Sequence, residues 1–201
     1  MKTGNRSRRT TLLGLLTAIL MVFGLTPLGY LNIGPLAISF NMIPVAIGAA
    51  ALGPVGGAIL GAVFGMTSFL QCLGIGGTSA MGVILLQINP LFAFIQRFVP
   101  RVTAGFLVGV IYQFARKFCK AGLAGSIAGF CAALLNTVLF MGALILLFGN
   151  TQYLTDLIAG RNVIVFVCTF VGVNAIAEAL AATAVTGALT AALERSGLLR
   201  R

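Results

Sequence analysis

The sequence predicts an all-α integral membrane protein with six transmembrane helices. Of its 201 residues, 59% are hydrophobic and 8% are charged, whereas soluble domains carry roughly a quarter charged residues. The mean hydropathy is +1.09, and apolar stretches of about 18 residues or more recur along the chain. The basic residues lie in short clusters between these stretches. We therefore expect residues 1–201 to form a single helical membrane domain.

The first expected helix covers residues 11–30. Basic residues precede the apolar run "TLLGLLTAILMVFGL", as they do in a signal peptide. No small-x-small cleavage site follows, so we expect a retained helix. The next segment, "LNIGPLAISFN", is uncharged and interrupted by Gly34 and Pro35. This composition predicts a loop close to the membrane.

An apolar run then extends over residues 42–73, which is too long for one crossing. Pro54 in "LGPVGG" breaks it into expected helices at 42–52 and 55–72. The Gly-rich stretch "QCLGIGGTSAMGVILLQINP" predicts an outer loop that folds back into the protein. The remaining expected helices cover 91–116, 121–148 and 162–193, and "GNTQYLTDLIAGR" joins the last two on the outer side.

The distribution of positive charge predicts the topology. Six helices place both termini on one side, and an excess of Lys and Arg marks the cytoplasmic side. Ten of the thirteen basic residues fit this pattern: Lys2, Arg6, Arg8, Arg9, Arg116, Lys117, Lys120, Arg195, Arg200 and Arg201. The other three, Arg97, Arg101 and Arg161, fall on the expected outer half. The net charge of +10 is thus explained by topology, without a nucleic-acid partner.

The composition also argues against several kinds of chemistry. The four cysteines have no CxxC spacing and the chain has no histidine, so we expect no metal site, disulfide framework or cofactor. No GxxxxGK[ST] phosphate loop is present. With three acidic residues, general acid–base catalysis has few candidates. We expect a protein that is not an enzyme.

Small residues recur at helical spacing in two places. Glycines at 53, 57, 61 and 65 form one stripe on the helix 55–72. Small residues let helix backbones approach closely in a membrane, so we expect this stripe to pack within the protein. Gly14 and Ala18 form a similar pair on the first helix. That pair predicts either internal packing or docking of another membrane subunit.

Polar residues inside the apolar helices predict a binding site. Glu178 lies four residues after Asn174 on one helix face, and Arg101 lies four residues after Arg97 on another. A carboxylate deep in a membrane is costly unless it has a partner, and such residues often mark a ligand pathway. The amides at the same expected depth, from the outer half to the middle, are Asn136, Asn41, Gln71 and Asn89.

Two interpretations of these groups are open. Arg97 could reach the outer headgroups while Arg101 pairs with Glu178 to hold helices together. Alternatively, two arginines and one glutamate leave a local charge of about +1, which a monovalent carboxylate ligand would neutralise. In that case Glu178 would accept hydrogen bonds from a hydroxyl or amide of the ligand.

The chain resembles the substrate-binding S components of energy-coupling factor (ECF) vitamin transporters, and among them the pantothenate type. The stretches that carry the resemblance are "IPVAIGAAALGPVGGAILGAVFGMTSF" (43–69), "FVPRVTAGFLVGVIYQFARK" (98–117) and "GVNAIAEALAA" (172–182). The resemblance implies a six-helix S-component bundle in a bacterial or archaeal cell membrane. It also implies capture of a vitamin from outside, with a membrane coupling subunit and two ABC ATPases as partners.

The resemblance also implies roles for individual residues. Gly14 and Ala18 would contact the coupling subunit, although the family's signature is two alanines four apart. Segments 31–42 and 73–90 would act as lids over the site. Pantothenate is a small monoanion with hydroxyls and an amide, so it agrees with the charge argument. The alternatives are another vitamin such as folate, a membrane scaffold protein, and a carrier or channel that works alone.

Overall fold

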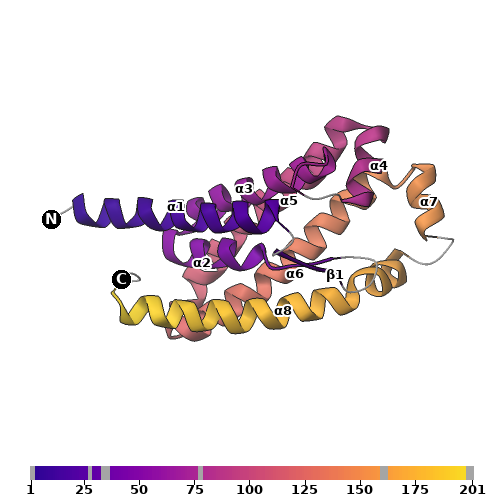
Figure 1. Cartoon of the computed structure of the whole chain (residues 1–201). Coiled ribbons are helices and arrows are strands. Elements are labelled where there is room, and N and C mark those ends of the chain that lie inside the picture. The colour runs from indigo at the N-terminus through magenta and orange to yellow at the C-terminus, as the bar shows by residue number, and fades with distance from the viewer. Residues whose placement is uncertain (1–2, 27–28, 33–36, 77–78, 159–162, 198–201) are drawn as a thin grey trace.

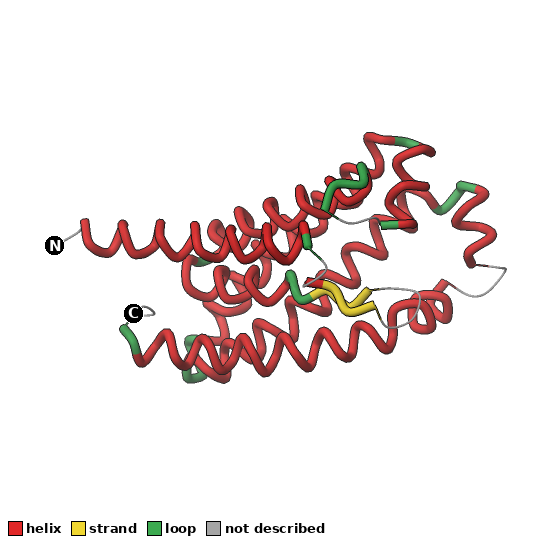
Figure 2. The backbone as a smooth tube through the Cα atoms, viewed as in Figure 1, coloured by secondary structure: helices red, strands yellow, loops and turns green. Residues whose placement is uncertain are grey.

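The protein is a bundle of helices with one small hairpin of strands (Figure 2). The computed structural model describes residues 3–26, 29–32, 37–76, 79–158 and 163–197. Four of the basic residues considered above lie outside these ranges: Lys2, Arg161, Arg200 and Arg201. The side chain of Cys168 is likewise not described.

Six helices account for the expected spans. These are α1 (Thr3–Leu25), α2 (Met42–Leu52), α3 (Pro54–Cys72), α5 (Pro90–Ala115), α6 (Ala121–Phe148) and α8 (Val163–Arg195). The expectation of 11–30 for the first helix was wrong, because the structure extends it through the basic N-terminal residues and ends it at Leu25. The bounds of the other five lie within two residues of those expected.

The connecting segments contain structure that the sequence did not predict. The expected loop after the first helix contains strands β1 (Tyr30–Asn32) and β2 (Ala37–Ser39), which pair antiparallel. The outer connections contain two short helices, α4 (Ala80–Ile88) and α7 (Gln152–Ile158). The predicted all-α class holds for the described bundle, to which the two-stranded hairpin is a small addition. Backbone pairing satisfies hydrogen-bonding groups that an irregular loop near a membrane would leave exposed.

Among the described residues, five helical segments are long and apolar enough to cross a membrane, which makes this a multi-pass membrane protein. They are Ser7–Leu25, Pro54–Cys72, Pro90–Ala115, Ala121–Phe148 and Asn174–Arg195. The expected sixth span, α2, has 11 residues, which at the helical rise is about 17 Å, short of the ~30 Å hydrocarbon core. Eight of its residues are buried, so α2 lies inside the bundle.

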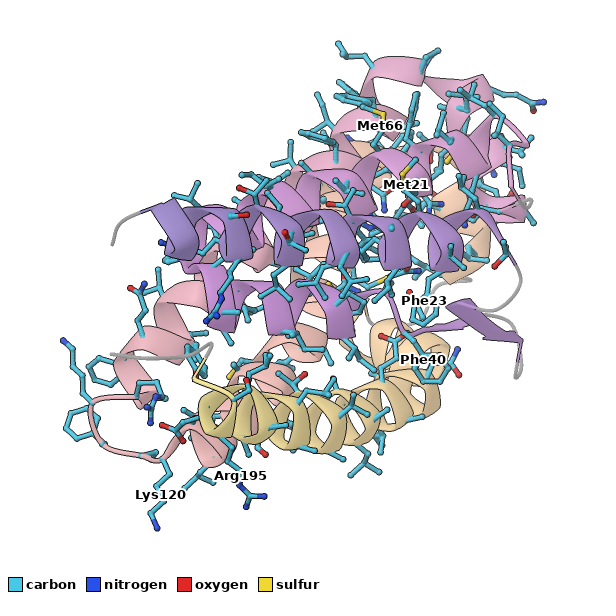
Figure 3. The ribbon with its side chains drawn as sticks, turned by 60° about the vertical axis from the view of Figure 1, so that its left-hand side comes forward. Met21, Phe23, Phe40, Met66, Lys120 and Arg195 are labelled. Atoms are coloured by element: carbon cyan, nitrogen blue, oxygen red, sulfur yellow. The ribbon has the colours of Figure 1, made fainter. Side chains whose placement is uncertain are left out.

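The bundle has two distinct ends. α1 begins and α8 ends at one end, while α4 and α7 lie at the other (Figure 1). Lys120, just before α6, and Arg195, at the end of α8, lie at the first of these ends (Figure 3). Arg116 also forms an ion pair with Glu194 there, at 2.6 Å. The basic clusters of the described residues thus gather at one end of the molecule.

The turn between α2 and α3 depends on the pair Gly53–Pro54. Gly53 has φ 85° and ψ −175°, a conformation open to glycine and strained for other residues. Its N–H donates to the Ala49 carbonyl at 3.0 Å and so ends α2. Pro54 then occupies the first turn of α3, where its missing N–H costs no hydrogen bond.

The glycine stripe of α3 packs directly on the backbone of α5. A β-carbon at Gly57 would overlap the carbonyl oxygen of Gly105, and one at Gly61 would overlap that of Arg101. A β-carbon at Gly65 would lie 2.9 Å from the Cα of Phe98. The expectation that this stripe packs within the protein is confirmed. Its consequence is that α3 fixes the backbone from which Arg97 and Arg101 project.

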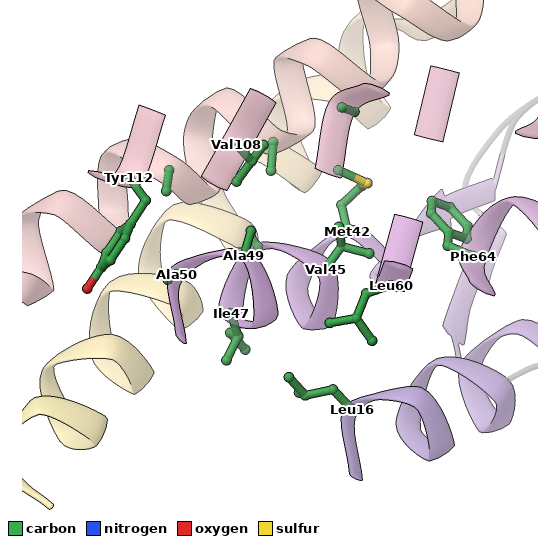
Figure 4. Close-up of a cluster of buried hydrophobic side chains, with 14 of the residues drawn as sticks. Leu16, Met42, Val45, Ile47, Ala49, Ala50, Leu60, Phe64, Val108 and Tyr112 are labelled. Carbon is green, nitrogen blue, oxygen red and sulfur yellow. The ribbon is translucent and has the colours of Figure 1, made fainter. Parts of the chain in front are cut away.

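Two apolar clusters hold the bundle together. The larger joins α1, α2, α3, α5 and α6, and Figure 4 shows part of it, with Tyr112 at one end and Phe64 at the other. The smaller joins α4, α5, α6 and α7 through Leu85, Ala93, Leu144 and Leu154. The arginine pair of α5 therefore lies on a helix that belongs to both clusters.

Candidate functional site

Arg97 and Arg101 are buried in the protein, with 6% and 5% of their surfaces exposed. Arg101 donates from Nη1 to the carbonyl oxygen of Arg97 at 2.7 Å. Arg97 donates to the Ser68 hydroxyl at 3.4 Å and to the Ser79 hydroxyl at 3.1 Å. At so little exposure, Arg97 does not extend from the protein surface towards headgroups. Both guanidinium groups instead point into the bundle.

Two aromatic rings surround these guanidinium groups. The guanidinium carbon of Arg101 lies 4.6 Å from the ring centroid of Phe64 and 4.8 Å from that of Phe140. The guanidinium carbon of Arg97 lies 5.2 Å from the centroid of Phe140. These distances are within the range of cation–π attraction. The rings hold two positive charges in an apolar surrounding.

Ser79 connects Arg97 to the segment that follows α3. Its hydroxyl accepts from the Gly82 N–H at 3.2 Å and so caps α4, while the same oxygen accepts from Arg97. The loop before it contains Gly74 and Gly76, with φ values of 81° and 78°. The described part of the expected lid at 73–90 contains a turn with two glycines and the helix α4, and Ser79 at the start of that helix contacts Arg97.

Glu178 is tied to the hairpin. Its Oε1 accepts from the Ser39 N–H at 2.6 Å, and the Ser39 hydroxyl accepts from the Asn41 amide nitrogen at 3.2 Å. The structure thus connects Glu178 of α8 with Asn41, at the start of α2, through the strand β2.

Asn174 and Asn136 complete the polar lining. Asn174 is 6% exposed and lies one helical turn before Glu178. Asn136 lies one turn before Phe140 on α6, so it shares the helix face that contacts the arginines. The buried Oδ1 atom of Asn136 has no hydrogen-bond partner among the described residues. An unsatisfied buried acceptor favours a site that a polar ligand completes.

Two of the predicted site residues have structural contacts instead. Gln71 donates to the Gly24 carbonyl at 2.6 Å and so joins α3 to α1. Asn89 accepts from the N–H groups of Leu91 and Phe92, both at 3.1 Å, and caps the start of α5. We assign these two amides to packing and helix capping, and leave them out of the site.

The sequence interpretation missed several residues around the arginines. Phe64 and Phe140 looked like ordinary apolar residues, and Ser68 and Ser79 carried no spacing signal. Gln96 was also missed, although it precedes Arg97 in a helix of apolar residues. It is fully buried, and neither polar atom of its amide has a partner among the described residues. A glutamine inside a predicted span was the signal that could have identified it.

The arrangement suits the binding of a small organic anion. Planar guanidinium groups donate paired hydrogen bonds to a carboxylate. Amides and a carboxylate on the opposite helices can bind hydroxyls and an amide of the same molecule. The burial of these groups strengthens each electrostatic contact relative to water. The arrangement is therefore a candidate for ligand recognition.

The outward face of α1 is bare. Gly14 and Ala18 are both exposed, and a β-carbon at Gly14 would meet no atom of the described chain within 4 Å. Leu15, Met21 and Val22 are about half exposed on the same helix. Internal packing is therefore excluded as the reason for the small pair, and the face is open to lipid or to another protein.

Comparison with known proteins identifies the class. The family model for the ECF transporter, substrate-specific component, matches residues 8–190. The chain therefore belongs to this family, and the resemblance seen in the sequence is confirmed. Proteins of the family are the substrate-binding subunits of their transporters.

The name of one similar protein states its substrate. Over 203 residues the chain is 26% identical to the pantothenic acid transporter PanT of Lactococcus lactis subsp. cremoris (strain MG1363). The alignment covers 96% of each chain. The similarity therefore extends over the whole membrane domain, including every helix that lines the site.

Proposed function

We propose that the protein is the pantothenate-binding subunit of an ECF-type importer in a bacterial or archaeal cell membrane. The observation that carries the proposal is the buried pair Arg97 and Arg101, whose guanidinium groups contact Phe140, one helical turn after Asn136 on α6. Glu178 is the proposed acidic group of the site. Two cations and one carboxylate leave a charge of about +1, which a monocarboxylate neutralises. The similarity to a pantothenic acid transporter over 96% of the chain supports the same ligand.

Each end of pantothenate has matching groups. Arg101, with Arg97 beside it, binds the carboxylate. Asn136 and Asn174 bind the amide and its neighbouring hydroxyl, while Glu178 accepts a hydrogen bond from the second hydroxyl. Asn41 supports Glu178 through Ser39 rather than through the ligand.

The remaining parts of the proposal concern transport. Uptake requires a membrane coupling subunit and two ATPases, since this subunit binds its vitamin and the ATPases supply the energy. Gly14 and Ala18, on the bare face of α1, form the contact with the coupling subunit. Both termini lie in the cytoplasm, which requires a sixth crossing; α2 is too short to span alone and forms this crossing together with the hairpin before it. Segments 31–42 and 73–90 close over the bound vitamin.

Calorimetric titration of the detergent-purified protein tests the proposal. We expect sub-micromolar binding of pantothenate, and much weaker binding of a panel of other vitamins. Tight binding of folate or another vitamin would keep the transporter class and replace the ligand. Absence of binding across the panel, by protein shown to be folded, would favour a scaffold protein. Uptake into liposomes by this chain alone would indicate an independent carrier.

A further inference from the structure

Phe140 contacts both cations of the site. Its ring centroid lies 4.8 Å from the guanidinium carbon of Arg101 and 5.2 Å from that of Arg97. Phe64 lies on Arg101 as well, at 4.6 Å. Arg101 is therefore in contact with a ring on α3 and a ring on α6, while Arg97 shares the second ring.

The two rings differ in how they are held. Phe64 is 2% exposed and belongs to the larger apolar cluster. Phe140 is half-buried and packs against the smaller cluster, beside Met141 and Leu144. Substitution of Phe64 would disturb the core directly, whereas Phe140 lies at the edge of its cluster. Phe140 is the member of the pair whose role can be tested in a folded protein.

We propose that Phe140 is a positioning residue that orients Arg97 and Arg101 for a carboxylate ligand. This inference rests on the proposed function. Two cations one helical turn apart repel each other, and the electron-rich face of an aromatic ring between them offsets part of that repulsion. Contact with the ring also restricts the rotation of these two long side chains, in addition to their hydrogen bonds.

The contact does not compete with the ligand. A ring attracts a guanidinium group through its π face, whereas a carboxylate binds along the N–H edges of the guanidinium plane. The ring therefore sets the direction in which the N–H groups point. An aliphatic side chain at position 140 fills the space without the quadrupole that attracts the cations. Recognition of the carboxylate should then weaken more than recognition of the rest of the ligand.

Calorimetry with two ligands tests this assignment. Pantothenate carries the carboxylate, and panthenol has a neutral hydroxymethyl group in its place. In Phe140→Leu we expect pantothenate to bind roughly tenfold more weakly, as cation–π contacts are lost, and panthenol to change less than about threefold. Phe140→Tyr keeps the ring and should restore the affinity for pantothenate.

Phe94→Leu is the matched control. Phe94 is also half-buried and packs on Phe69 and Phe98, with both centroids at 5.1 Å. It should leave both affinities unchanged. If Phe140→Leu weakens both ligands equally, or leaves pantothenate unaffected, Phe140 does not position the arginines.

A second measurement does not depend on the vitamin. In protein labelled with ¹⁵N-arginine, ring currents displace the side-chain N–H resonances of Arg97 and Arg101, which Arg97→Lys and Arg101→Lys assign. Phe140→Leu should shift both resonances, and Phe94→Leu neither. Unmoved resonances would refute the inference even if pantothenate binds. Shifted resonances in a protein that binds no pantothenate would refute the proposed function and leave standing the contact of Phe140 with both arginines.

Discussion

Replacement of Arg101 by glutamine tests the carboxylate site most directly. The variant keeps a polar side chain but loses the charge and the forked donors that lie between Phe64 and Phe140. A hydrogen bond to a charged group contributes about 1.5–3 kcal/mol. One lost bond therefore predicts at least tenfold weaker pantothenate binding, and a lost bidentate pair roughly 100-fold.

The assay is calorimetric titration of purified Arg101→Gln with pantothenate and with panthenol. Panthenol has no carboxylate, so its affinity should change little. Arg195→Gln removes an exposed arginine from the last turn of α8 and is the matched control for net charge. A thermal unfolding curve for each variant separates lost binding from lost fold. Unchanged pantothenate affinity in folded Arg101→Gln would remove Arg101 from the site.

Three further predictions test other parts of the structure. Glu178→Ala removes the acceptor of the Ser39 N–H and should lower stability by about 1–3 kcal/mol, while Glu178→Gln keeps an acceptor and should cost less; equal unfolding temperatures for the two would contradict the tether. Gly61→Leu should abolish folding or lower the free energy of unfolding by about 3 kcal/mol, because a β-carbon at this position overlaps the backbone of α5. Gly142→Leu is the control and should be tolerated, because a β-carbon there meets no described atom within 4 Å. Gly14→Leu should bind pantothenate normally in detergent yet lose uptake in liposomes that contain the coupling complex, and normal uptake would move the docking face elsewhere.

Hydrophobic periodicity and length predicted the long helices well, because a membrane requires continuous apolar segments whose backbone bonds are internal. Pro54 marked the break between α2 and α3, because proline has no backbone N–H to donate within a helix. The start of α1 was predicted too late, because a helix can extend beyond its apolar segment into charged residues. Its first turns carry charge, and Arg9 is held there by a hydrogen bond to the Leu52 carbonyl at 2.9 Å. That contact joins residues 43 positions apart, which no local pattern indicates.

The site was predicted in part. Arginines, amides and a glutamate stand out in apolar helices, because burial of such groups is costly and therefore uncommon. The structure buries Arg97 and Arg101, places Phe140, one turn after Asn136, against them, and ties Glu178 to the hairpin. Asn89 instead has a capping role that its position before Pro90 also suits. The sequence did not identify Phe64 and Phe140 as site residues, because an aromatic ring has the same hydrophobic character in a core as beside a cation.

Ligand binding and the proposed docking to a coupling subunit depend on different elements. The arginine pair is fixed from several directions: Gly61 and Gly65 press on its backbone, Phe140 contacts its guanidinium groups, and Ser79 accepts a hydrogen bond from Arg97. Such restraint lowers the entropy lost on binding and so favours tight capture of a scarce anion. The outward face of α1, in contrast, contributes nothing to that network. We therefore expect changes on α1 to alter the proposed docking without altering the proposed vitamin site.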